Sequence, residues 1–151
     1  MTKLQDTVVS FFKDNGWNMI ELESKNTWKI PFSGRHGKWD CYARVRESQQ
    51  QFVFYSILPT KVARHKCIEI ASLISKINYG LIIGNFELDL NDGEIRCKTS
   101  IDVTNDRLSI ALVKSLVFTN VAIVDKYLPE FMDIINSNEA FIENQPEIDT
   151  P

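Results

Sequence analysis

The chain has 151 residues, the usual length of one domain with a substantial hydrophobic core. Its hydrophobic fraction of 44%, charged fraction of 25% and net charge of −3 argue against a general affinity for nucleic acid or anionic lipid. The apolar runs are too short for a membrane span, and the first fifteen residues lack a signal-peptide core. Three widely spaced cysteines, Cys41, Cys67 and Cys97, indicate neither a disulfide framework nor a zinc site. We therefore expect a cytoplasmic protein.

The first part of the chain predicts a helix followed by a meander of four strands. One apolar stripe indicates a helix over Lys3–Asn15, and Gly16 is a favoured residue just after a helix. Turns at 24–26, 34–37 and 48–49 then separate alternating runs, and their lengths set the register of the strands. The predicted pairs on the core face are Leu22 with Trp28, Trp28 with Ala43, Ile30 with Cys41, Phe32 with Trp39, Trp39 with Leu58, Cys41 with Ser56, Ala43 with Phe54, and Val45 with Phe52.

A second helix and a hairpin are predicted next. The helix follows Pro59, with Thr60 as its N-cap. Its apolar stripe contains Ala63, Cys67, Ile70, Ile74 and Ile77. A two-residue type I′ turn at Asp92-Gly93 would then pair the hairpin strands. The predicted core-face pairs are Leu90 with Ile95, Leu88 with Cys97 and Phe86 with Thr99, and the predicted ion pairs on the other face are Asp89 with Arg96 and Glu87 with Lys98.

The third helix is predicted to begin at Ser109 as N-cap and to be kinked or split at Pro129, because proline cannot donate the helical hydrogen bond. Two apolar rows indicate that this helix is deeply buried or shared with a partner. Residues 137–151 carry four acidic and no basic side chains and predict a disordered tail, in which Phe141 and Ile142 are the exceptions that could dock. We therefore expect one domain over residues 1–136.

This order of elements predicts an α+β fold. Helix, four-strand meander, helix, β-hairpin and long helix together indicate one antiparallel sheet with helices packed on one face. In the predicted register, the other face presents aromatic, apolar and arginine side chains, which is typical of a binding surface. The candidate partner-binding or dimer face consists of Tyr42, Arg44, Val53, Tyr55 and Ile57, with Arg46 and Asp40 beside them. Coverage by a second copy or by the chain itself, a bound partner, and plain exposure all remain open.

No catalytic site, metal site or cofactor is predicted. Cys41 and Cys97 fall on the core face, where free cysteine behaves as a small hydrophobic residue. Cys67 lies on the inner stripe of the second helix, and His65 falls on another side of it. The glycine-flanked loop that contains His36 could bind an anion but fits a plain hairpin connection better. Glu87 and Asp89 alternate along an exposed face, and no metal-ligand spacing or nucleotide-binding motif appears.

Two stretches carry a resemblance to a known family: Asn78–Asp89 and, directly after it, Asp92–Arg96. Together with the upstream Phe52–Ser56 segment and the Leu58-Pro59 exit, they resemble the bacterial YbjN-domain family. The resemblance covers about residues 28–129. The chain departs from the family pattern at Cys97 and Ile110, where an aromatic residue and a proline are expected, and both departures concern packing and capping.

The resemblance implies a fold like that of type III secretion chaperones, with a twisted antiparallel sheet, helices on one side and a common tendency to dimerise. It also implies a role in sensory transduction or stress regulation, or as a chaperone-like module, and supplies no catalytic residues. We therefore expect a non-enzymatic protein-binding module, a homodimer with a protein client. The alternatives are a small enzyme that uses Cys67 and a single-stranded nucleic-acid binder that uses the basic runs 35–38 and 64–66.

Overall fold

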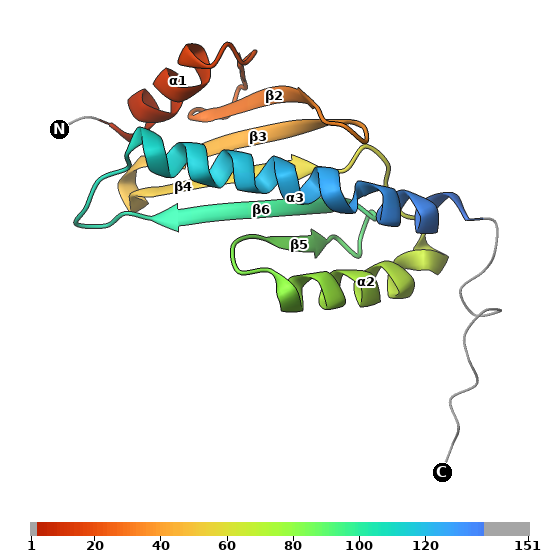
Figure 1. The fold of residues 1–151 in the computed structure, drawn as a ribbon. Coiled ribbons are helices and arrows are strands. Elements are labelled where there is room, and N and C mark those ends of the chain that lie inside the picture. The colour runs from red at the N-terminus through yellow and green to blue at the C-terminus, as the bar shows by residue number, and fades with distance from the viewer. Residues whose placement is uncertain (1–2, 138–151) are drawn as a thin grey trace.

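A six-stranded antiparallel sheet forms the centre of the computed structural model, which describes residues 3–137 (Figure 1). The strands lie in the order β1-β2-β3-β4-β6-β5, so β6 lies beside the meander and β5 at the edge. The strands are β1 (Ile20–Glu21), β2 (Thr27–Ser33), β3 (Lys38–Arg46), β4 (Gln51–Ile57), β5 (Asn85–Leu88) and β6 (Ile95–Asp102). The helices are α1 (Leu4–Asp14), α2 (Cys67–Gly80) and α3 (Ile110–Asn136), with short 3-10 turns η1 (Glu47–Gln49) and η2 (Arg64–Lys66). The predicted α+β class and the predicted order of elements are confirmed.

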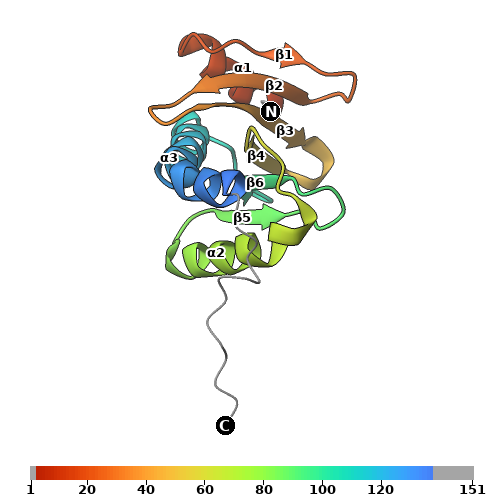
Figure 2. The same ribbon diagram turned by 90° about the vertical axis from the view of Figure 1, so that its right-hand side faces the viewer.

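Two helices cover one face of the sheet. α3 runs along β4 and β6, and α1 packs beside α3 (Figures 1 and 2). α2 packs against β5 and so lies at the edge of the sheet. Among residues 3–137, no helix lies over the opposite face, which we call the open face. The predicted layer arrangement is therefore confirmed, with α2 displaced toward the edge.

The core lies between the covered face of the sheet and the two helices. The predicted stripe of α1 (Leu4, Val8, Phe11 and Phe12) is buried. Phe12 stacks on Phe54 of β4 with ring centroids 6.0 Å apart, and Phe11 meets Phe118 of α3 edge-on at 6.1 Å. Burial of such a side chain contributes about 1.5–3 kcal/mol. These rings fix α1 and α3 together over the meander.

The register predicted for the three long meander strands is confirmed. Cys41 lies opposite Ser56, Tyr42 opposite Tyr55, and Ile30 opposite Cys41. A slip of one residue would move every side chain to the other face. The register therefore decides which residues reach the open face.

The predicted pairing of the first strand is wrong by one residue. Glu21, and not Leu22, lies opposite Trp28, and the Leu22 N–H donates to the Thr27 carbonyl at 2.9 Å. Asn26 takes a left-handed conformation at φ 62, which tightens the turn. β1 is consequently only two residues long, and Ile20 is exposed.

The predicted hairpin register is wrong by two residues. Leu88 lies opposite Ile95 and Glu87 opposite Arg96, so the loop is longer than an Asp-Gly turn. The Asp89 and Asp92 carboxylates accept the backbone N–H groups of Asn91 and Glu94, each at 2.9 Å, and side chains of this kind stabilise longer turns. Because a shift of two residues preserves the faces, Phe86 and Leu88 still face the core, whereas Leu90 lies in the loop and is exposed. The predicted Asp89–Arg96 ion pair does not form, since Arg96 pairs with Glu87.

The second helix begins later than predicted. Thr60 does not cap it; α2 begins at Cys67 after η2, and the intervening loop pairs with the hairpin turn through the Val62 N–H and the Gly93 carbonyl at 2.9 Å. At the end of α2, the Asn78 side chain lies along the outer edge of β5. Its Oδ1 accepts the Phe86 N–H at 2.8 Å, and its Nδ2 donates to the Phe86 carbonyl at 3.0 Å.

The third helix is capped as predicted but is not split. Ser109 accepts the Leu112 N–H at 3.1 Å, and Pro129 lies inside one helix. A proline leaves the carbonyl four residues earlier without its helical donor. Here that carbonyl belongs to Asp125, and His36 Nδ1 donates to it at 2.8 Å. The loop that contains His36 therefore supplies the hydrogen bond that Pro129 cannot.

A buried polar cluster attaches α3 to the sheet. The Ser56 hydroxyl donates to Asn120 Oδ1 at 2.6 Å. Asn120 Nδ2 donates to the carbonyls of Phe54 at 2.9 Å and Cys97 at 3.2 Å. Thr99 donates to the Leu116 carbonyl at 2.9 Å. Buried polar groups are costly unless paired, so this cluster favours one position of α3 over β4 and β6.

Candidate functional site

The open face carries the five candidate residues. β3 contributes Tyr42 and Arg44, and β4 contributes Val53, Tyr55 and Ile57. Tyr42 and Tyr55 form a direct cross-strand pair, and Arg44 lies opposite Val53. Val53 is buried at 9% exposure, the tyrosines and Ile57 are half-buried, and Arg44 is exposed. The chain thus presents a continuous aromatic and apolar strip on a face that no helix of the described residues covers.

Charged side chains of β6 border this strip. The Arg96 guanidinium lies 4.4 Å from the centre of the Tyr55 ring, a cation–π contact. Glu87 accepts hydrogen bonds from both Arg96 and Lys98 at 2.7 Å. Burial raises the pKa of Glu87, but the hydrogen bonds from Lys98 and Arg96 outweigh it and hold the pKa below its ordinary value. The Arg44 side chain, in contrast, has no hydrogen bond or ion pair within residues 3–137.

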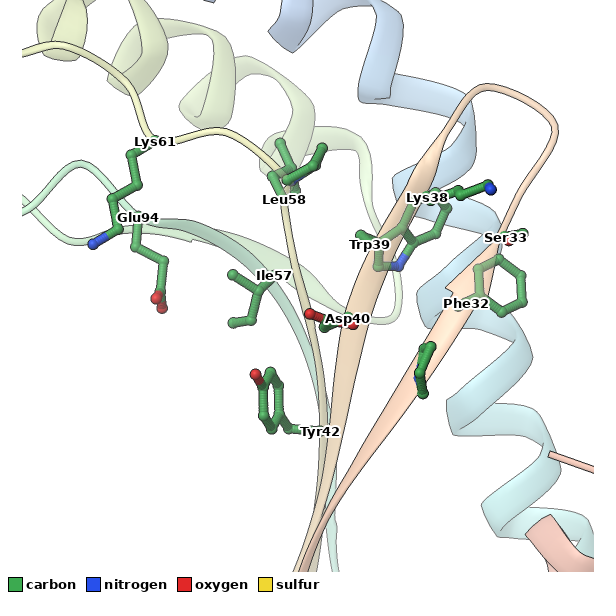
Figure 3. Close-up of a pocket in the computed structure, with 12 residues that line it drawn as sticks. Phe32, Ser33, Lys38, Trp39, Asp40, Tyr42, Ile57, Leu58, Lys61 and Glu94 are labelled. Carbon is green, nitrogen blue, oxygen red and sulfur yellow. The ribbon is translucent and has the colours of Figure 1, made fainter. Parts of the chain in front are cut away.

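Two hollows lie at the two ends of the strip. The first, of about 570 Å³, lies where β4 leaves the sheet, and we call it the Asp40 hollow (Figure 3). Its lining on the open face includes Pro31, Asp40, Tyr42, Ile57, Lys61 and Glu94. The second, of about 270 Å³, is the Arg44 hollow, lined on the open face by Arg44, Arg46, Val53, Tyr55, Lys98 and Ser100. The Tyr42–Tyr55 pair lies between them, so an extended segment laid along β3 would contact both.

The sequence does not predict the Arg96–Tyr55 contact or the Asp40 hollow beside the strip. The approach of Arg96 to Tyr55 depends on β6, and not β5, lying beside β4. The Asp40 hollow depends on Lys61, from a loop that was predicted as the start of a helix. Both features are tertiary, and no local spacing indicates them.

Two of the three thiols are buried, and the third meets a backbone carbonyl. Burial raises the pKa of Cys41 and of Cys97 to about 12, so both stay protonated at neutral pH. Cys67 is half-buried, and its Sγ donates weakly to the Ala63 carbonyl at 3.7 Å. His65 is exposed on η2, and within residues 3–137 neither it nor His36 has a hydrogen bond with Cys67.

One residue of each basic run has a structural role. Lys66 is buried at 5% exposure, and its ammonium donates to the carbonyls of Ile135 and Ser137 at the end of α3. His36 donates to α3 through its ring and its backbone N–H. Burial raises the pKa of Asp125, but the backbone N–H groups of His36 and Arg35 lower it to a net value below the ordinary one. These contacts join the loops to the helix.

The described residues contain no metal-binding group. Within residues 3–137, no three His, Cys, Asp or Glu side chains are placed to hold a metal ion. In the same range, no helix combines the length and the apolar character that a membrane crossing requires. The arrangement offers contact surface and fixed charges.

Solved structures of similar fold include two chaperone complexes. This chain is similar to a chain in the structure of the HopA1-SchA chaperone-effector complex. The two share 14% identity with a TM-score of 0.54, and the match covers 83% of this chain and 92% of the other. This chain is also similar to the Yersinia pestis type III secretion chaperone SycH in complex with a fragment of YscM2. The match covers 83% of this chain and 98% of the other, at 11% identity and a TM-score of 0.51. At such identities the likeness shows the fold alone. The fold is therefore that of the type III secretion chaperones.

The family follows from the sequence match. The chain is similar to Escherichia coli YbjN, described as "a putative transcription regulator", over 84% of this chain and 92% of that one, at 13% identity and a TM-score of 0.63. The family model for YbjN, described as "Putative bacterial sensory transduction regulator", matches residues 4–132. This chain belongs to the YbjN family, as the resemblance predicted. A search of curated proteins by sequence finds no match.

Proposed function

We propose that this protein is a non-enzymatic protein-binding module that holds a segment of a client protein on the open face of its sheet, in a regulatory or chaperone-like role. The observation that carries the proposal is the aromatic strip, with Tyr42 opposite Tyr55 and a hollow at each end. Aromatic and arginine side chains dominate the energy of protein interfaces. Chaperone complexes among the structural neighbours support a protein client.

Two further features belong to this proposal. We propose a homodimer, supported by the exposed apolar side chains at the end of α2, and a cytoplasmic location, supported by the free cysteines. The alternative of a Cys67 enzyme gains no support, since the contact of this thiol is with a backbone carbonyl. Nucleic-acid binding through the basic runs gains none either, since Lys66 and His36 are occupied at α3.

The test is client capture by a double variant, Tyr42→Ala with Tyr55→Ala. Truncation of an interface tyrosine that anchors a partner costs at least about 1–2 kcal/mol, so the pair should lower client affinity by roughly tenfold or more. The measurement is a crosslinking pull-down from the native cell, followed by titration of the recovered client.

The matched control is Tyr42→Phe with Tyr55→Phe, which keeps both rings and should keep most of the affinity. Circular dichroism and urea unfolding establish that each variant is folded. Equal client recovery by the alanine and phenylalanine variants would contradict a role for the aromatic strip.

A further inference from the structure

The last fourteen residues account for the negative charge of the whole chain. Residues 138–151 contain Glu139, Glu143, Glu147 and Asp149 and no lysine or arginine. The preceding 137 residues contain 17 basic and 16 acidic side chains. A slightly basic domain is therefore joined to a strongly acidic segment, and the two attract each other at low ionic strength.

The structure fixes the point at which this segment leaves the domain. Ser137 follows the last residue of α3, and the buried Lys66 donates to its carbonyl and to that of Ile135. Lys61 lies five residues before Lys66 and lines the Asp40 hollow. Five residues span at most about 18 Å, so the stretch from Lys66 to Lys61 connects the start of the segment with the rim of this hollow.

The length of the segment matches the length of the strip. Fourteen extended residues reach about 46 Å, and Arg44 lies four residues along β3 from Asp40, about 14 Å. Phe141 and Ile142 lie four and five residues beyond Ser137, so extended chain carries them up to about 13–17 Å from it. Glu147 lies five residues beyond Ile142, a separation of about 17 Å, which is close to the spacing of the two hollows.

The acidic side chains near the end of the segment are complementary in charge to the basic side chains of the Arg44 hollow. The Arg44 hollow contains Arg44, Arg46 and Lys98, against the single carboxylate of Asp102. Arg46 bonds to Gln51, and Lys98 to Glu87, whereas Arg44 is unpaired within residues 3–137. A carboxylate from Glu147 or Asp149 is therefore the complement that this hollow lacks.

We propose that residues 138–151 lie on the open face in cis, with Phe141 and Ile142 at the Asp40 hollow and Glu147 and Asp149 at the Arg44 hollow, and compete there with the client. This inference rests on the proposed function for the identity of the competitor. A short tether gives an effective concentration in the millimolar range, so contacts too weak to hold a free peptide suffice. A client must displace the segment, which sets a threshold for capture.

The test uses the full chain and needs no client. A nitroxide is attached to Ile148→Cys in a Cys67→Ser background, since Cys41 and Cys97 are buried. In the isotope-labelled protein, the amide signals of β3 and β4 around Arg44 and Val53 should broaden. Arg44→Glu should remove most of the broadening, and Arg44→Glu combined with Glu147→Lys and Asp149→Lys should restore it.

The matched control is Lys114→Glu, which changes the net charge equally at an exposed position of α3. It should leave the broadening unchanged. Broadening confined to η2 and the end of α3 would overturn the proposal, as would an equal effect of the two charge reversals. Broadening between an isotope-labelled chain and a separate nitroxide-bearing chain would also overturn it, because the contact would then join two copies.

Client capture separates this inference from the proposed function. If the segment competes, Glu147→Gln with Asp149→Asn should raise client affinity severalfold over the natural chain. Unchanged affinity of a captured client would contradict the competition. If the nitroxide signals are as expected and no variant captures any client, the contact stands and the proposed function fails.

Discussion

At the scale of single residues, Asn120 joins the helix layer to the sheet. It is fully buried, and its amide contacts groups on both β4 and β6. The sequence does not reveal this role, because Asn120 falls among the apolar positions of α3 that predict packing. Ser56 and Thr99 lie beneath it and form hydrogen bonds with its side chain, so a buried polar residue is stable at this position.

Replacement of Asn120 should therefore be strongly destabilising. Asn120→Ala leaves the Ser56 hydroxyl and two sheet carbonyls without this partner and opens a small cavity, so we expect a loss of about 2–4 kcal/mol in the free energy of unfolding. Urea unfolding measures it. The neighbouring Thr119→Ala, at a half-buried site, should change stability by less than about 1 kcal/mol, and an equal loss in both variants would argue against the cluster.

At the scale of elements, the loop between β2 and β3 is built to contact α3. A Cβ atom on Gly34 would lie 2.5 Å from Asp125 Oδ1 and 2.8 Å from the Trp39 ring. A Cβ atom on Gly37 would lie 2.7 Å from a Leu128 methyl group. A Cβ atom on either glycine would therefore force a neighbouring side chain to shift, so the close approach of the loop to α3 favours glycine at both positions. The sequence predicts only a plain hairpin connection here.

Gly34→Ala should push this loop away from the helix. The change breaks the contacts of His36 with Asp125, so we expect a loss of about 1–3 kcal/mol, as for other overpacked sites. Thermal unfolding followed by circular dichroism measures it. Gly80→Ala is the matched control, because a Cβ there meets nothing within 4 Å, and it should not lower stability. Similar losses from both changes would contradict the close approach.

The sequence predicts elements better than their ends. Strand register was correct where a turn joined long alternating strands, as for Tyr42 opposite Tyr55. It was wrong at the hairpin, because the carboxylates of Asp89 and Asp92 stabilise a longer loop than an Asp-Gly pair suggests. The start of α2 was misplaced because the segment from Leu58 to Val62 pairs with the hairpin turn, a contact distant in sequence.

The candidate site was predictable only in part. Because the meander register was correct, the five residues of the strip were placed on one face together. The hollows at its ends were not predicted. Lys61 reaches one of them from a loop that was predicted as helix, and Lys98 reaches the other because β6 lies beside β4. Alternation within a strand determines its face, whereas the order of strands is decided by the packing of the whole chain.

At the scale of the whole molecule, apolar side chains are exposed at the end of α2. Tyr79 is 96% exposed, Ile82 93% and Ile83 52%. Contiguous exposed apolar side chains in soluble proteins often mark contact surfaces. They lie beyond the β5 edge, away from the aromatic strip, so a second copy bound there would leave the open face accessible.

Ile82→Asp should therefore weaken the proposed homodimer. A charge placed in an apolar contact must be desolvated, so we expect the dimer dissociation constant to rise by at least about tenfold. Light scattering during size-exclusion chromatography measures the mass over a dilution series. The control is Ile20→Asp, at an exposed position on the opposite edge. A natural chain that is monomeric at all concentrations, or an equal effect of Ile20→Asp, would contradict this interface.

The Asn78 carboxamide restricts how such an assembly is built. It occupies the positions that a peptide group of a seventh strand would take, one acceptor and one donor directed at Phe86. A strand from another molecule cannot pair with β5 at this point without first displacing it. Copies that meet at this edge must therefore associate through side chains. The sheet is protected there from the edge-to-edge strand pairing that leads to fibres.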